Sequence, residues 1–232
     1  MKTTEKNCRL FFNQSCALCS TFPATETGLC EGCHTDLPWL VAACRRCAEP
    51  LTSHQDLLCP NCVKDPPPFD RTHAAFRYSF PINQIIPTVK YHRRPAMLGW
   101  LSRSLAQLMR DRLENDIPEA LIPVPMHPWR SFRRGFNQAE LIAAILGQEL
   151  GIPVIEKGIS RKAGGAHQAE LNRQERLANL RHSFQVRRTL PASVAIVDDV
   201  MTTGATAREL ARTLREHGAV HIQIWALART PS

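Results

Sequence analysis

Four C-x-x-C pairs near the start of the chain carry thiols at the spacing of metal ligands. All 9 cysteines of the 232 residues lie within residues 1–62, and eight of them form these pairs. One such turn directs two thiolates at one ion and a second turn completes a tetrahedral S4 site, so four pairs predict two structural zinc sites. The predicted ligands are Cys16, Cys19, Cys30, Cys33, Cys44, Cys47, Cys59 and Cys62.

Disulfides, a redox motif and iron are the alternatives to zinc. Disulfides need an oxidising compartment, and a thioredoxin-like motif is typical of one pair on a βαβ unit rather than of four evenly spaced pairs. Iron also suits an S4 site, but the ribbon-like spacing favours zinc. The sequence leaves open whether consecutive pairs share an ion or the pairing is crossed. Cys8 is left over as a free thiol, and His34 and His54 are spare ligands at best.

Two adjacent carboxylates, Asp198 and Asp199, follow the apolar run Val194–Val197 and precede a turn rich in threonine and glycine. A buried strand followed by a turn and a helix start places these side chains where open α/β sheets bind ligands. The free N–H groups of a helix start attract an anion, whereas two acids repel one. The pattern therefore indicates a ligand with a phosphate at one end and vicinal hydroxyls at the other, such as a sugar 5-phosphate, with Mg²⁺ sharing the charge. The alternative is an ordinary strand–turn–helix.

Strands and helices must alternate to position this turn, and the sequence after residue 69 shows that alternation. Apolar residues at helical spacing predict helices over residues 97–113, 139–150, 170–180 and 206–217. Short apolar runs predict strands over residues 120–125, 152–155, 194–197 and 220–227. Such alternation predicts an α/β domain with a parallel sheet flanked by helices.

The cysteine-rich segment is predicted to be a separate small domain. It has few aliphatic residues between the pairs, so bound metal supplies most of its folding energy. Three consecutive prolines at 66–68 then act as a stiff spacer. The predicted domains are a double zinc ribbon at 1–65, a proline-rich linker at 66–69 and the α/β domain at 70–232.

Charge and hydropathy restrict the partners and the location. The formal net charge is +8, and residues 66–232 hold 23 basic against 14 acidic side chains. This excess is mostly arginine, which suits anionic partners. No apolar run approaches the ~20 residues of a membrane span, and no secretory signal is readable at the N-terminus. The expected location is cytoplasmic.

The run V-A-I-V-D-D-V-M-T-T-G-A-T at 194–206 resembles the phosphoribosyl pyrophosphate (PRPP) signature of type I phosphoribosyltransferases. The resemblance implies a type I phosphoribosyltransferase-like parallel sheet. It implies that Asp198 and Asp199 bind the ribose hydroxyls and are the catalytic residues, and that Mg²⁺ binds together with PRPP. The residues that it implies for the 5-phosphate are Thr202, Thr203, Gly204, Ala205 and Thr206.

A wider resemblance covers nearly the whole chain. The cysteine pairs, the loop at 123–128, the block R-G-F-N-Q at 134–138 and the PRPP signature follow one another as in the ComF family, whose members are associated with natural competence and the use of external DNA. The resemblance makes residues 157–172 a flap with Arg161 and Gln168 as ligand contacts. It implies that pyrophosphate binds to Pro125, Met126, His127 and Arg130; a rigid turn with solvated arginines is the alternative.

A basic cluster with one aromatic side chain lies at Tyr91, Arg93 and Arg94. Arginines on phosphates and a tyrosine stacked on a base would bind single-stranded DNA. The alternative is that this segment forms a loop of the small hood that lies over the sheet in phosphoribosyltransferases.

Three functions follow from these patterns. The first is a PRPP-binding protein in the uptake or use of external DNA, which binds single-stranded DNA and has a protein partner in the competence machinery. The second is an active phosphoribosyltransferase, a glycosyltransferase that moves ribose 5-phosphate from PRPP to a nitrogenous acceptor in nucleotide metabolism. The third is a PRPP sensor without chemistry. Aromatic residues are only 6% of the chain, and none is assigned to an acceptor pocket, so the sequence does not decide between binding and transfer.

Overall fold

The chain separates into two compact units, Met1–Leu37 and Pro38–Ser232. The computed structural model describes residues 15–20, 24–25, 27–52, 57–92, 96–113, 116–127, 135–162 and 183–231. The boundary between the units falls inside the cysteine-rich segment, so the last two C-x-x-C pairs belong to the same unit as the sheet. In the first unit the described residues contain one short helix, α1 (Glu31–Thr35), for which the Cys30 sulfur caps the N–H of Cys33.

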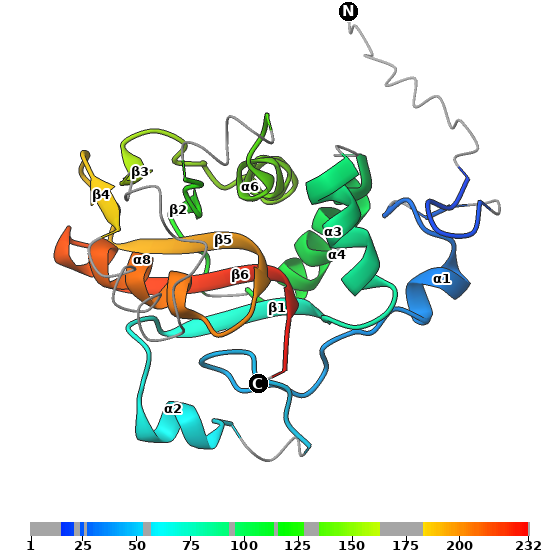
Figure 1. The fold of residues 1–232 in the computed structure, drawn as a ribbon, viewed down its shortest axis with the longest axis horizontal. Coiled ribbons are helices and arrows are strands. Elements are labelled where there is room, and N and C mark those ends of the chain that lie inside the picture. The colour runs from blue at the N-terminus through cyan, green and yellow to red at the C-terminus, as the bar shows by residue number, and fades with distance from the viewer. Residues whose placement is uncertain are drawn as a thin grey trace, which may run out of the picture. The chain divides into compact units, whose positions relative to one another are not determined.

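A four-stranded parallel sheet forms the centre of the second unit, in the order β1-β6-β5-β2 (Figure 1). Because parallel strands need a crossover connection, helices separate them in the sequence. A second, two-stranded antiparallel sheet pairs β3 with β4. In the described part of the chain the strands are β1 (Arg71–Arg77), β2 (Ala120–Pro123), β3 (Ile159–Arg161), β4 (Phe184–Val186), β5 (Ser193–Met201) and β6 (His221–Arg229).

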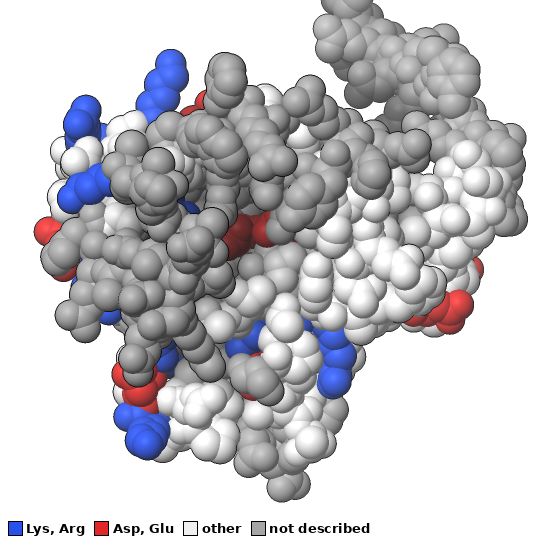
Figure 2. All heavy atoms as spheres, viewed as in Figure 1, with Lys and Arg blue, Asp and Glu red and all other residues white. Residues whose placement is uncertain are grey.

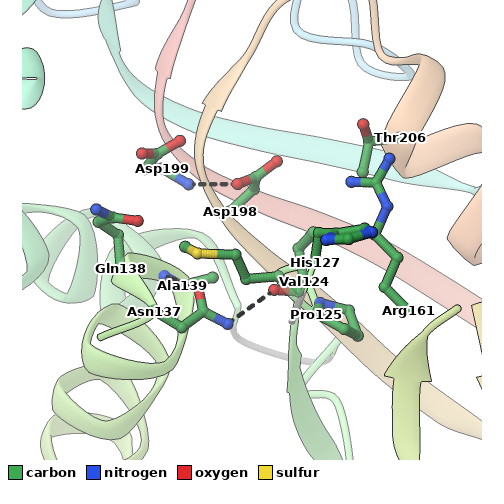
Figure 3. Close-up of a pocket in the computed structure, with 11 residues that line it drawn as sticks. Val124, Pro125, His127, Asn137, Gln138, Ala139, Arg161, Asp198, Asp199 and Thr206 are labelled. Atoms are coloured by element: carbon green, nitrogen blue, oxygen red, sulfur yellow. Dashed lines mark hydrogen bonds between the residues drawn. The ribbon is translucent and has the colours of Figure 1, made fainter. Parts of the chain in front are cut away.

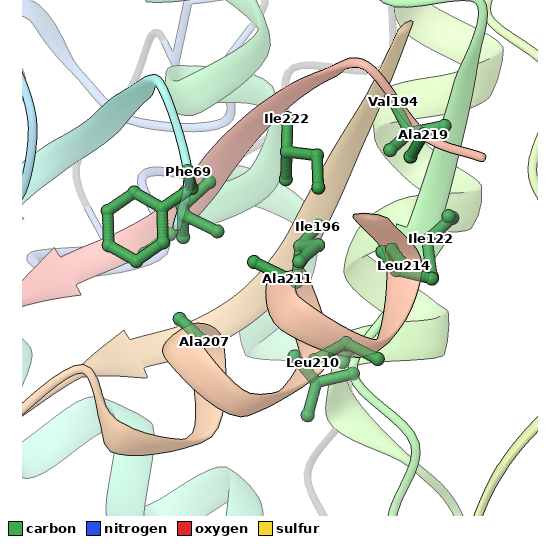
Figure 4. Packing of buried hydrophobic residues seen from close by; sticks show 14 of the residues in the cluster. Phe69, Ile122, Val194, Ile196, Ala207, Leu210, Ala211, Leu214, Ala219 and Ile222 are labelled. Carbon is green, nitrogen blue, oxygen red and sulfur yellow. The ribbon is translucent and has the colours of Figure 1, made fainter. Parts of the chain in front are cut away.

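Helices cover both faces of the sheet (Figure 1). On one face α8 packs through Ala207, Leu210, Ala211 and Leu214 onto alternate residues of the central strands, such as Val194 and Ile196 (Figure 4). The intervening residues of each strand point to the opposite face, where α4 and α6 pack against each other and against the strands. Among the described residues of this unit, the helices are α2 (Pro60–Lys64), α3 (Ile82–His92), α4 (Ala96–Arg112), α6 (Gln138–Leu150) and α8 (Ala205–Glu216).

The predicted fold class is confirmed: a parallel sheet flanked by helices follows a cysteine-rich segment. The expected strand at 152–155 is wrong, since this segment makes only a bridge between Val154 and Leu121. Its ladder stops because Pro153 has no N–H to donate. Neither β1 nor α3 was among the predicted elements, and the helix expected at 170–180 lies outside the described residues. Among the described residues, no helix is both long and apolar enough to span a bilayer.

A histidine is buried in β1. His73 is 5% exposed, and its Nε2 atom has no partner among the described residues. Burial, reinforced by the charges of Arg71 and Arg112, lowers the pKa of His73 to about 3, whereas the unfolded chain keeps the ordinary value near 6.5. Below about pH 6.5 the unfolded state therefore binds a proton that the folded state does not, so stability is full above that pH and falls as the pH decreases towards 3.

We expect the free energy of unfolding of the wild type to decrease between about pH 7 and about pH 5 by up to roughly 1.4 kcal/mol per pH unit from this group. In the variant His73→Leu the free energy of unfolding should decrease less steeply over the same pH range, because this titrating group is absent. Urea unfolding of both proteins at each pH measures the difference, with the zinc content checked in parallel. Identical slopes for the two proteins would show that His73 does not titrate in this way.

Candidate functional site

The two adjacent carboxylates lie near the carboxyl end of β5, beside a cavity of about 200 Å³. Asp198 is half-buried and Asp199 is 8% exposed. The backbone N–H of Asp199 donates to Oδ1 of Asp198 over 2.8 Å, which fixes one side chain against the next residue (Figure 3). Both acids line the cavity, so the structure presents two oxygen-rich groups at the end of a rigid central strand.

The turn after β5 leads directly into the N-terminus of α8. Gly204 is the N-cap residue and has φ +73°, a left-handed conformation that favours glycine. Thr203 Oγ1 accepts a hydrogen bond of 3.4 Å from the N–H of Ala205. The first N–H groups of a helix have no partner within it, and here they lie at a second, smaller cavity of about 40 Å³ lined by Thr202–Ala207. The turn can therefore hold an anion by backbone and hydroxyl donors.

The loop after β2 faces the acids across the larger cavity (Figure 3). Pro125, Met126 and His127 are half-buried there. Asn137 caps α6 by accepting the N–H of Ala139 over 3.1 Å, and its Nδ2 donates to the carbonyl of Val124 over 3.1 Å. This buried side chain ties the start of α6 to the loop, so that the loop keeps its position opposite β5.

Arg161 supplies a positive charge to the cavity from the end of β3. Its guanidinium lies 5.8 Å from the ring centre of Phe184, across the β3–β4 pair. In Figure 3 the side chain extends towards Thr206 at the start of α8. The cavity thus combines two carboxylates, a hydroxyl and a guanidinium, an arrangement that can hold a ligand carrying both hydroxyls and a phosphate.

The structure brings most of the predicted ligand-binding residues to these two cavities, which share Val124, Asp198 and Thr206. Asn137 and Gln138 also line the larger cavity but were not among the predicted site residues. The signal was present, because both belong to the block R-G-F-N-Q at 134–138. Tyr91 lies near the end of α3 and is not among the residues that line either cavity. Four predicted site residues lie outside the described part of the chain: Arg93, Arg94, Arg130 and Gln168.

The eight predicted zinc ligands form two clusters of four sulfur atoms, each with all sulfurs within 4.8 Å of one another. The Sγ atoms of Cys19 and Cys30 are 3.6 Å apart, as are those of Cys47 and Cys59. A disulfide would bring them to about 2.05 Å, whereas Zn–S bonds of about 2.3 Å in a tetrahedron separate the sulfurs by about 3.8 Å. The clusters therefore fit a tetrahedral ion, and consecutive pairs share each one: Cys16, Cys19, Cys30 and Cys33 in the first cluster, Cys44, Cys47, Cys59 and Cys62 in the second.

The thiols of one cluster cannot all ionise without a cation. Burial raises the pKa of Cys16, but backbone hydrogen bonds from Cys19 and Cys30 outweigh it and lower that pKa to about 6. Hydrogen bonds of its thiol with Cys19 and Cys30 raise the pKa of Cys33 to about 12. In the second cluster, burial raises the pKa of Cys47 to about 11. A bound divalent cation would remove this conflict by stabilising all four thiolates.

We expect the purified protein to carry about two equivalents of zinc, one for each S4 cluster. Replacing Cys44 and Cys47 with serine should remove one equivalent and loosen the second cluster, while the first keeps its ion. Mass spectrometry under native conditions or atomic emission measures the content. An iron–sulfur absorption spectrum, or disulfides in the freshly purified protein, would contradict the assignment.

Comparison with known proteins bears on both parts of the chain. Residues 8–63 match the double zinc ribbon domain family, which, together with the two clusters, supports the prediction of two structural zinc sites. "Competence protein F" of Haemophilus influenzae is 33% identical, over 94% of this chain and 98% of its own length. "DNA utilization protein YhgH" of Salmonella typhimurium is also 33% identical, over 93% of this chain and 96% of its own.

Solved structures similar to this chain include a purine phosphoribosyltransferase from Pyrococcus horikoshii. It has 22% sequence identity and a TM-score of 0.37, and the match covers 58% of this chain and 74% of that one. A TM-score of this size supports no inference about function, which depends instead on the site described above.

Proposed function

This chain belongs to the ComF family, and on that premise we propose that it binds PRPP and acts in the uptake or use of external DNA. The single observation that carries the PRPP part is the pairing of Asp198 and Asp199 with an anion-binding turn at the next helix start. A ligand that matches both needs hydroxyls next to the acids and a phosphate next to the turn. Ribose 5-phosphate has both, since its 5-phosphate and its vicinal hydroxyls are at opposite ends of the sugar.

The proposed ligand has one place for each of its groups. The ribose hydroxyls donate to Asp198 and Asp199, and the 5-phosphate accepts from the turn Thr202–Thr206. The pyrophosphate lies along Pro125–His127, with Arg130 as a further contact, and Arg161 and Gln168 approach it from the flap. Mg²⁺ bound with PRPP would offset the repulsion between the two carboxylates and the phosphates.

Calorimetric titration of the full-length protein with PRPP, with and without Mg²⁺, tests this proposal. One binding site that requires Mg²⁺ is the expected result. Titration with ribose 5-phosphate separates the contribution of the sugar phosphate from that of the pyrophosphate. Absence of binding to PRPP in the presence of Mg²⁺, by a protein that is folded and loaded with zinc, would overturn the proposal.

An active phosphoribosyltransferase is the second candidate function, and the intact acid pair and turn favour it. In that reaction the bond between ribose C1 and a pyrophosphate oxygen breaks, a bond between C1 and an acceptor nitrogen forms, and the nitrogen loses a proton. Incubating the protein with PRPP and a panel of purines, pyrimidines and their nucleotides would detect it as released pyrophosphate. PRPP binding without release for any acceptor favours the binding protein or sensor.

The remaining parts of the proposal concern organisation and location. We propose that residues 1–65 act as the double zinc ribbon, that 66–69 link it to the ligand-binding domain at 70–232, and that the protein works in the cytoplasm with a partner from the competence machinery.

We also propose binding to single-stranded DNA, supported by the net charge of +9 over residues 66–232. On the face shown in Figure 2 the described Lys and Arg side chains lie in several separate groups rather than in one patch. Binding through distributed phosphate contacts weakens as salt rises, with a slope of about −0.7 per contact in log affinity against log salt.

Replacing Arg93 and Arg94 with alanine should lower the affinity for all single-stranded sequences alike and flatten this slope by roughly 1.4, the loss of two contacts. The matched control replaces Arg187 and Arg188, an exposed pair next to β4, which removes the same charge at another place. Fluorescence anisotropy with a labelled oligonucleotide at ~50 and ~200 mM salt makes the measurement. No binding at the lower salt would exclude a direct role in DNA binding.

A further inference from the structure

Arg229, the last residue of β6, joins the second cysteine cluster to the turn that follows β5. Its guanidinium is buried, and the residue is 3% exposed. Nε donates to the carbonyl of Cys47 over 3.0 Å, and a terminal nitrogen pairs with the carboxylate of Glu49. The other terminal nitrogen donates to the carbonyl of Thr202 over 2.6 Å and to that of Met201 over 3.3 Å. One side chain thus contacts a metal-ligand residue and the start of the Thr/Gly turn.

The surrounding geometry brings the same two segments together. A cavity of about 230 Å³ is lined by Cys47, Cys59 and Cys62 of the second cluster together with Thr203, Gly204 and Arg229. A second link lies at its edge, where Arg208 of α8 pairs with Asp65 over 3.1 Å. All of these residues belong to the unit Pro38–Ser232, whereas the first cluster belongs to Met1–Leu37.

The chemistry of the link requires both segments to stay in place. An arginine has five N–H donors in a rigid planar fork, and here these reach acceptors on both sides. A buried cation that loses its acceptors destabilises the fold. If Cys47 and Glu49 moved away, the Arg229 side chain would therefore have to move as well. Its hydrogen bonds to the carbonyls of Met201 and Thr202 would change with it. The conformation of the turn therefore depends on the order of the second cluster.

We propose that Arg229 is a positioning residue through which metal binding at the second cluster, and not at the first, holds the Thr202–Gly204 turn in its anion-binding conformation. This inference rests on the proposed function for its ligand, PRPP. The second S4 site then has a role besides folding, because loss of its metal ion lowers the affinity for PRPP at the turn after β5.

The test compares two pairs of variants of the full-length protein. Arg229→Lys keeps the positive charge and loses the fork; we expect it to retain two zinc equivalents and to bind PRPP at least about tenfold more weakly. Cys59→Ala should lose one zinc equivalent with a similar loss of affinity. The controls are Arg215→Lys, which perturbs an arginine bonded to Pro68, Asp70 and Val220, and Cys19→Ala, which empties the first cluster. Both controls should leave PRPP affinity unchanged.

Hydrogen–deuterium exchange of the peptide spanning residues 201–207 gives a readout that needs no ligand. Exchange should be faster in Arg229→Lys and Cys59→Ala than in the wild type and the two controls. If Cys59→Ala does not fold, exchange in Cys19→Ala with and without a zinc chelator takes its place, because the second ion is the one that this variant can still lose. Unchanged exchange in Arg229→Lys would overturn the inference. Faster exchange in a protein that never binds PRPP would uphold the link and overturn only the proposed function.

Discussion

Replacing both Asp198 and Asp199 with alanine should abolish Mg²⁺-dependent binding of PRPP. These carboxylates line the cavity of about 200 Å³ at the end of β5, and they are the two carboxylates of the segment Asp198–Thr206 that can accept from the ribose hydroxyls of the proposed ligand. Loss of two charge-assisted hydrogen bonds, at about 1.5–3 kcal/mol each, corresponds to a decrease in affinity of at least about a hundredfold. Calorimetry on the folded variant measures it.

The isosteric variant with asparagine at both positions separates charge from shape. Oδ1 of the first asparagine still accepts the N–H at position 199, as Asp198 does over 2.8 Å, so the end of β5 keeps its conformation. We expect this variant to melt near the wild-type temperature and still to lose Mg²⁺-dependent binding. As a control, Glu216→Ala removes an exposed acid at the far end of α8. Wild-type affinity in the double alanine variant would show that the acids do not contact the ligand.

Gly204→Val should reduce PRPP affinity by at least about tenfold and also lower stability. Gly204 has φ +73°, and a residue with a Cβ pays roughly 1–2 kcal/mol to adopt that conformation. The nearest atom to an added Cβ would be Cε of Met201 at 2.8 Å, the mobile end of a side chain. Backbone strain rather than crowding is therefore the main effect, and it distorts the turn whose N–H groups receive the phosphate.

The matched control is Gly218→Val, at the other end of the same helix. Gly218 has φ +100°, and an added Cβ there meets no atom within 4 Å. This change should lower the melting temperature through the same kind of strain but leave PRPP affinity unaltered. Differential scanning calorimetry and ligand titration on the two variants separate the effects. Equal losses of affinity in both would mean that the turn has no particular role in binding.

The periodicity of the sequence predicted most of the elements that surround the cavity beside Asp198 and Asp199. Val194–Val197 lies within the central strand β5, and the alternating run at 220–227 overlaps β6, which begins at His221. Strands of a parallel sheet are covered on both faces, which explains the continuous apolar run of β5. The amphipathic segments at 97–113, 139–150 and 206–217 correspond to α4, α6 and α8 within two residues. β1 gave a weaker signal, because its sequence R-T-H-A-A-F-R mixes polar with apolar residues although its five central residues are buried.

The site itself was only partly accessible from the sequence. Asp198, Asp199 and the Thr/Gly turn form one continuous motif, so local order alone places them at a strand end and a helix start. Asn137 at the start of α6 donates to the carbonyl of Val124, thirteen residues away, and no local pattern identifies that acceptor. Its role required the packing of α6 against β2.

The sequence by itself determined that the chain has two S4 sites and one acid-and-turn motif, because ligand spacing and strand–turn–helix order are local properties of the chain. Only the tertiary structure decided which cysteines share an ion and which cluster lies beside the turn. Both depend on how distant segments pack: the last two C-x-x-C pairs form a compact unit with the sheet, and Arg229 reaches Cys47, 182 residues earlier. Contacts of that kind arise from the folding of the whole unit, and spacing along the chain does not encode them.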